Sequence, residues 1–129
     1  MAIELKMLLY TVVLFVIQVA AQTLVGLLQN GPGYAFGSQD DEKISVGIGA
    51  RIERAYYNLL ETMPPFAALV LIGLYTGKLN EMTALGSQLY FWGRVVYIPA
   101  YLSGIPMLRT LVWAVSFFGI LLILWQLLI

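Results

Sequence analysis

A row of polar and charged residues interrupts the apolar stretch between residues 49 and 77. Arg51, Arg54, Asn58 and Glu61 step by three, four and three residues, so all four share one face of a helix. An amphipathic surface resting in water would explain Arg51, whereas Glu61 lies too deep in the apolar stretch for that explanation. The row therefore predicts a polar pocket beside this helix.

A second row, Arg94, Tyr97 and Tyr101, has the same spacing within residues 80–102. A structural ion pair with Glu61 is one interpretation of Arg94, and such a pair can itself position neighbouring pocket groups. The two tyrosines line the same pocket or belong to an aromatic belt at a membrane surface. We include all three residues in the predicted binding site.

Arg109 and Thr110 follow Pro106, a residue favoured at the first position of a helix. The free backbone N–H groups and the dipole of a first helical turn add positive potential to the arginine guanidinium. This combination predicts an anion site, and a thiolate is an anion. The alternative is an arginine whose side chain extends to a lipid phosphate.

The sequence contains no cysteine and no histidine. Their absence excludes disulfides, thiol nucleophiles, imidazole bases and most transition-metal sites, so we expect no metal centre. Thiol chemistry would require a thiol from a bound molecule. The net charge is zero, so nothing indicates a nucleic-acid partner.

The composition places these residues in a lipid environment. Of 129 residues, 60% are hydrophobic and 11% charged, and the mean hydropathy is +0.85. A soluble domain averages about 25% charged residues, and a small one cannot bury so much apolar surface. The N-terminal apolar run continues to Leu28, beyond the roughly 7–15 residues of a signal-peptide core, so we interpret it as a membrane span.

Four apolar stretches approach the roughly 20 residues that a helical membrane span needs. We expect a single all-α domain, an integral membrane four-helix bundle, with spans at about residues 5–28, 49–77, 80–102 and 106–128. Asn80 is a good N-cap for the third span. The links on either side of that span are so short that the last three spans must pack as antiparallel neighbours.

Depth along the helices groups the polar residues. At about 1.5 Å per residue, Glu61, Arg94 and Arg109 fall at similar depths in the bilayer. Charges within a span cost about 2.5–3.5 kcal/mol each on insertion scales, so they usually mark a functional site. We expect each helix to contribute polar groups to this half of the bilayer, and nearly none to the other half.

The basic residues predict the orientation. The face with the first and third loops carries four of them, and the face with both termini and the second loop carries Lys6 and Lys78. The four are Lys43, Arg51, Arg54 and Arg109. The positive-inside rule then predicts a multi-pass protein whose pocket faces the cytoplasm, with both termini on the opposite side.

The stretch from Arg51 to Phe66, RIERAYYNLLETMPPF, resembles the signature R-x-x-R-A-x-x-N-x-x-E-x-x-x-P-F. That signature belongs to the MAPEG family, the membrane-associated proteins in eicosanoid and glutathione metabolism, in its branch of microsomal glutathione transferases and prostaglandin E synthases. The stretch from Phe91 to Tyr97 followed by Tyr101 resembles the third helix of that branch. Arg109-Thr110 falls where the branch carries Arg-Ser.

The resemblance implies a homotrimer of four-helix protomers that binds glutathione in a cleft between protomers. It implies that Arg109 stabilises the glutathione thiolate, with Thr110 in place of the neighbouring serine. It further implies that Arg54 and Arg94 hold the polar network together. The implied glutathione contacts are Asn58, Glu61, Tyr101 and Arg109.

Three positions depart from the family pattern. Asn30 and Tyr57 replace two arginines that bind glutathione in the prostaglandin synthase branch, and Tyr97 replaces a histidine. Glutathione has two carboxylates, which arginine binds bidentately and asparagine or tyrosine cannot. This protein therefore has fewer arginines to bind the glutathione carboxylates than that branch has.

These observations lead to one hypothesis and two alternatives. The hypothesis is a glutathione-dependent membrane transferase or peroxidase, acting on lipophilic electrophiles or lipid hydroperoxides that arrive through membrane lipid. The first alternative is a non-enzymatic member of the family that binds a lipid. The second is a trimeric membrane protein that uses another anionic thiol or lipid.

Overall fold

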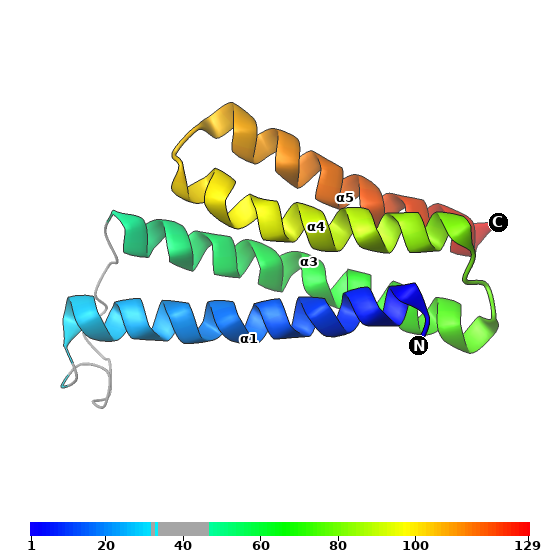
Figure 1. Cartoon of the computed structure of the whole chain (residues 1–129), viewed down its shortest axis with the longest axis horizontal. Helices are drawn as coiled ribbons and strands as arrows, with labels where there is room; N and C mark the ends of the chain where they lie inside the picture. The colour runs from blue at the N-terminus through cyan, green and yellow to red at the C-terminus, as the bar shows by residue number, and fades with distance from the viewer. Residues whose placement is uncertain (32, 34–46) are drawn as a thin grey trace.

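The described part of the protein is an all-α bundle of four helices, as the sequence predicts. The computed structural model describes residues 1–31, 33 and 47–129 (Figure 1). Its helices are α1 (Ile3–Asn30), α3 (Ile48–Thr76), α4 (Glu81–Leu102) and α5 (Pro106–Leu128). Lys43, which contributes to the predicted orientation, lies outside the described residues.

The helices run alternately in opposite directions, so both termini lie at one end of the bundle (Figure 1). The end of α1, the start of α3 and the turn from α4 to α5 lie at the other end. α4 packs against α1, α3 and α5, whereas α1 and α5 do not touch within the described residues. α4 is therefore the most enclosed helix of the described chain.

Three helices of the described chain, α1, α3 and α5, are long and apolar enough to cross a membrane. α4 does not join them on these grounds, because it carries Arg94 and a series of buried glycine, serine, threonine and tyrosine residues. α3 and α5 run in the same direction (Figure 1), so α4 must return across the membrane to connect them. The chain is an integral membrane protein.

Local sequence features account for the ends of α4 and α5. The Asn80 side chain accepts hydrogen bonds from the backbone N–H groups of Met82 and Thr83, at 2.9 and 3.0 Å. The Thr83 hydroxyl in turn accepts the backbone N–H of Asn80 at 2.7 Å, which completes a capping box. Pro106 occupies the first turn of α5. Asn80 is thus the N-cap that the sequence predicts.

Close packing of α4 on α5 depends on glycine. A Cβ on Gly86 would lie 2.6 Å from the carbonyl oxygen of Gly119, so neither position tolerates a side chain. Small residues at a helix interface allow this approach, as is common in membrane bundles. One turn after Gly86 on α4, Tyr90 stacks on Phe66 of α3 with ring centroids 4.2 Å apart. α4 is thereby held between its neighbours.

The end of the bundle near the termini contains polar contacts that the sequence does not predict. The Thr83 hydroxyl donates a hydrogen bond to the carboxylate of Glu4, which is buried. Nearby, the Asn80 side chain donates to Gln126 Oε1 at 2.9 Å. The expectation that this half contains nearly no polar groups is wrong, because these side chains satisfy one another and so tolerate burial.

Candidate functional site

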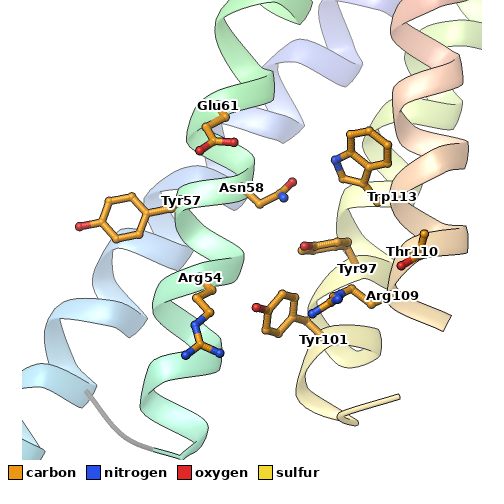
Figure 2. Close-up of a pocket in the computed structure, with 9 residues that line it drawn as sticks. All are labelled: Arg54, Tyr57, Asn58, Glu61, Tyr97, Tyr101, Arg109, Thr110 and Trp113. Carbon is orange, nitrogen blue, oxygen red and sulfur yellow. The ribbon is translucent and has the colours of Figure 1, made fainter. Parts of the chain in front are cut away.

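A cavity of about 440 Å³ separates α3 from α4 and α5, at the end of the bundle opposite the termini (Figures 1 and 2). It is lined by nine residues: Arg54, Tyr57, Asn58, Glu61, Tyr97, Tyr101, Arg109, Thr110 and Trp113. Seven of the eight residues predicted for the site are among these nine. The eighth predicted residue, Arg94, does not line the cavity.

The α3 wall presents Arg54, Asn58 and Glu61 along one helix face, as their spacing requires. Arg54 and Glu61 are exposed, and neither forms an ion pair in the described part of the chain. Asn58 points across the cavity toward α4 and α5 in Figure 2. Its Oδ1 is buried and has no hydrogen-bond partner among the described residues. This wall therefore offers one cation, one anion and a free acceptor.

The opposite wall combines aromatic rings with a cation. The rings of Tyr97 and Tyr101, one turn apart on α4, have centroids 5.6 Å apart. The Arg109 guanidinium lies 5.2 Å from the centroid of the Tyr101 ring, a cation–π arrangement across the α4–α5 turn. One turn further along α5, Trp113 stacks on Phe117 at 5.1 Å with an interplanar angle of 7°. An apolar surface thus continues from Arg109 along α5.

Thr110 uses its hydroxyl within its own helix. The hydroxyl donates a hydrogen bond of 3.0 Å to the backbone carbonyl of Pro106. The hydroxyl oxygen keeps accepting capacity toward the cavity, whereas donation to a ligand would require the hydrogen to leave Pro106. Thr110 is therefore a weaker anion-binding group than Arg109.

Arg94 lies behind the cavity wall. It is 2% exposed, and its guanidinium carbon is 4.2 Å from the centroid of the Tyr97 ring. Its Nε and Nη1 are buried without a hydrogen-bond partner in the described chain. The structure contains no ion pair between Arg94 and Glu61, although both residues are described. The proposed pairing is wrong for the described chain, because Glu61 is exposed at the cavity whereas Arg94 is buried within α4 packing beside Tyr97.

A smaller cavity of about 190 Å³ adjoins the first one at the end of the bundle. Arg54, Tyr101 and Arg109 line both cavities, and Arg51 lines only the smaller one. None of the three arginines forms an ion pair with a carboxylate of the described chain. The opening of the site is therefore rich in positive charge, as an anion site requires.

Two lining residues, Tyr57 and Trp113, are not among the predicted site residues. The sequence spacing could have predicted both, because Tyr57 follows Arg54 by three residues and Trp113 follows Arg109 by four. Residues at these separations share a helix face. Asn30, at a family arginine position, is the last residue of α1 and does not line either cavity. No group of three or more metal-ligating side chains occurs in the part of the chain that the structure describes.

One comparison with known proteins identifies the family of this chain. The sequence model of the MAPEG family matches residues 7–129, which include most of α1, all of α3, α4 and α5, and every residue of both cavities. No curated protein and no solved structure matches the chain in the corresponding comparisons. A match over nearly the whole chain shows that this integral membrane protein belongs to the MAPEG family.

Proposed function

We propose that this protein is a glutathione-dependent membrane transferase or peroxidase that acts on lipophilic electrophiles or lipid hydroperoxides. The observation that carries the proposal is the position of Arg109. It lies in the first turn of α5 and lines one cavity with Asn58, Glu61 and Tyr101. Membership of the MAPEG family, whose members generally use glutathione, supports the same assignment.

The lining residues match the functional groups of a thiol tripeptide. A volume of about 440 Å³ falls within the roughly 300–1,000 Å³ of small-molecule sites. Arg54 provides a bidentate partner for a carboxylate. Glu61, the only carboxylate in the lining, and the free Oδ1 of Asn58 suit the donors of an ammonium group. Arg109 is then available to bind the sulfur of the thiol.

In this proposal Arg109 lowers the pKa of the bound thiol below the ~8.5 of a free cysteine. Two features add to its effect: the dipole of α5 and the surrounding apolar medium, which strengthens any charge interaction. Glutathione supplies the nucleophilic sulfur. Arg109 holds the charge of the thiolate, while Tyr97, Tyr101 and Trp113 exclude water from that end of the cavity and present an apolar surface to the second substrate.

The proposal includes a homotrimer with the site between protomers. Arg54 and Glu61 are exposed on α3, within a helix that spans the membrane. Charged side chains that face lipid are costly, so such residues almost always face protein or water. A neighbouring protomer packed on this side of α3 would cover both residues and close the cavity.

A second candidate function is lipid binding without catalysis. It is favoured by Tyr57, which lines the cavity where the resembled branch carries an arginine. A tyrosine cannot bind a carboxylate bidentately, and it enlarges the aromatic surface. In this reading the cavity holds a lipid whose anionic group meets Arg54 and Arg109.

Calorimetry on the purified protein tests the proposal. Glutathione should bind, and S-methylglutathione, which cannot form a thiolate, should bind more weakly. Wild-type protein should also turn over a model aryl halide or a hydroperoxide. Binding of neither thiol, together with no turnover, would reject the assignment and leave lipid binding as the first candidate.

A further inference from the structure

The two walls of the cavity are joined by a hydrogen bond at its open end. Arg51, in the first turn of α3, donates from Nη1 to the backbone carbonyl of Leu102 at 3.0 Å. Leu102 is the last residue of α4. Among the described residues, the only other side-chain hydrogen bond from α3 to α4 joins Thr62 to Tyr90, deeper in the bundle. The Arg51 bond therefore spans the opening by itself.

The chemistry of this contact favours a firm hold. Carbonyls in the last turn of a helix lack an intrahelical partner, and the helix dipole favours a cation there. A donor with full charge makes a stronger hydrogen bond than a neutral one. Arg51 therefore gives the free carbonyl of Leu102 a hydrogen-bond donor and places a positive charge at the negative end of the α4 dipole.

Gly104 makes room for the same guanidinium. Its φ of +77° belongs to the region that glycine adopts without strain. A Cβ at this position would lie 3.2 Å from both Nη1 and Nη2 of Arg51. The turn between α4 and α5 is thus built around the Arg51 side chain.

Arg109 depends on this turn. Gly104 and Ile105 precede α5, and the backbone N–H of Arg109 bonds to the carbonyl of Ile105 at 3.2 Å. A shift of the turn away from α3 would carry Arg109 with it. The side chains that complete the cavity on α3, Asn58 and Glu61, would stay behind.

We propose that Arg51 is a positioning residue. Its hydrogen bond to Leu102 and its place beside Gly104, together called the Arg51 clasp, set the width of the cavity. The clasp thereby holds Arg109 opposite Asn58 and Glu61. The consequence for thiol activation rests on the proposed glutathione function, whereas the clasp itself does not. Arg51 acts through the turn rather than on the thiol, since it does not line the larger cavity.

The far end of the bundle provides a matched control. Lys78, just after α3, donates from Nζ to the carbonyl of Leu127 in the last turn of α5, at 3.2 Å. Lys78→Gln removes one positive charge and one bond from a cation to a helix C-terminus, as Arg51→Gln does. It does so at the end opposite the cavity.

The first measurement is the width of the opening. The chain lacks cysteine, so Ile48→Cys and Ile105→Cys introduce two labelling sites, at positions 60% and 52% exposed. Spin labels on both, in chains co-assembled with an excess of unlabelled chain, report their distance distribution. Arg51→Gln should broaden this distribution and shift it to longer distances, and Lys78→Gln should leave it unchanged. An unchanged distribution in Arg51→Gln overturns the proposal.

The second measurement separates positioning from direct binding. At saturating glutathione, Arg51→Gln should lower the thiolate absorbance and kcat by about tenfold, because small misplacements of a catalytic group are costly. Arg51→Lys should restore part of both. Gly104→Ala, which keeps the charge but crowds the guanidinium and strains the turn at its positive φ, should resemble Arg51→Gln. A rise in KM alone, with normal kcat and a normal Gly104→Ala variant, would instead make Arg51 a substrate contact and reject the clasp.

The two hypotheses fail in different ways. If the wild-type protein neither binds nor ionises glutathione, the proposed function fails, and the label distances still decide the role of Arg51. If the wild-type protein is active and Arg51→Gln retains its distances, thiolate signal and kcat, only the clasp is wrong.

Discussion

The Thr83 hydroxyl, in the first turn of α4, donates a hydrogen bond of 2.6 Å to the carboxylate of Glu4, in the first turn of α1. Glu4 is only 4% exposed, so this contact lies inside the bundle. The same hydroxyl accepts the backbone N–H of Asn80 in the capping box. A single threonine thus caps α4 and attaches the N-terminal helix to it, at the end opposite the cavity.

Removing this hydroxyl should destabilise the protein. Thr83→Val keeps the shape of the side chain but deprives the buried Glu4 carboxylate of its donor, which typically costs about 1–3 kcal/mol. Thermal unfolding in detergent should show a lower midpoint for Thr83→Val, and Thr83→Ser should stay close to the wild type. Equal midpoints for the valine and serine variants would contradict the role of the hydroxyl.

Glu61 and Arg94 should affect stability independently. They form no ion pair in the structure, so the effects of Glu61→Gln and Arg94→Leu on the free energy of unfolding should add within about 0.5 kcal/mol. The measurement is a double-mutant cycle from unfolding in detergent. Tyr97→Leu with Arg94→Leu is a positive control, because these two side chains are in contact. A coupling of about 1 kcal/mol or more between Glu61 and Arg94 would show that they meet in the assembled protein.

Helical spacing and depth predict most of the cavity lining for a physical reason. Residues three or four positions apart share a helix face, and the rise per residue sets their height along the bundle. These rules place Arg54, Asn58 and Glu61 opposite Tyr101 and Arg109, as the structure has them. The same spacing would have found Trp113 one turn after Arg109.

These rules fail where the rotation of a helix about its own axis determines whether two side chains meet. Glu61 and Arg94 have similar heights, yet Arg94 is buried behind the cavity wall beside Tyr97, and Glu61 is exposed in the cavity lining. Height alone cannot distinguish contact from separation. The burial of Glu4 cannot be predicted from the sequence for a related reason. A lone carboxylate near a terminus is typical of an exposed helix end, and its burial depends on Thr83, which is 79 residues away.

The orientation in the membrane can be tested with single cysteines. Ile105→Cys lies at the cavity end, and Tyr75→Cys, at a position 94% exposed, lies near the end of α3 at the opposite side. The excess of arginine at the cavity end predicts that it faces the cytoplasm. A membrane-impermeant maleimide added to intact cells should label Tyr75→Cys and spare Ile105→Cys until the membrane is opened. The reverse pattern would invert the orientation and place the site outside.

The assembly should be a trimer that buries the exposed face of α3. Native mass spectrometry in detergent should show three copies. Glu61→Lys reverses the charge on the α3 face that the proposal places against a neighbouring protomer, so it should weaken the trimer; Lys78→Glu, at the far end, should weaken it less. A stable monomer or dimer of the wild-type protein would remove the site between protomers from the proposal.

The state of the bound thiol separates an enzyme from a lipid-binding protein. If Arg109 stabilises a thiolate, adding glutathione near neutral pH should raise the ultraviolet absorbance, because the pKa of the bound thiol falls below ~8.5. Arg109→Leu should abolish this signal while the fold and assembly remain, since Arg109 lies in a first helical turn and not in the core. Thr110→Val should weaken it less. It removes one hydroxyl, already bonded to Pro106, and a hydrogen bond contributes roughly 0.5–1.5 kcal/mol. Lys78→Gln, remote from the cavity, should keep the full signal. If the wild-type protein binds glutathione without a thiolate signal and without turnover, Arg109 does not activate the thiol, and lipid binding becomes the better account of the cavity.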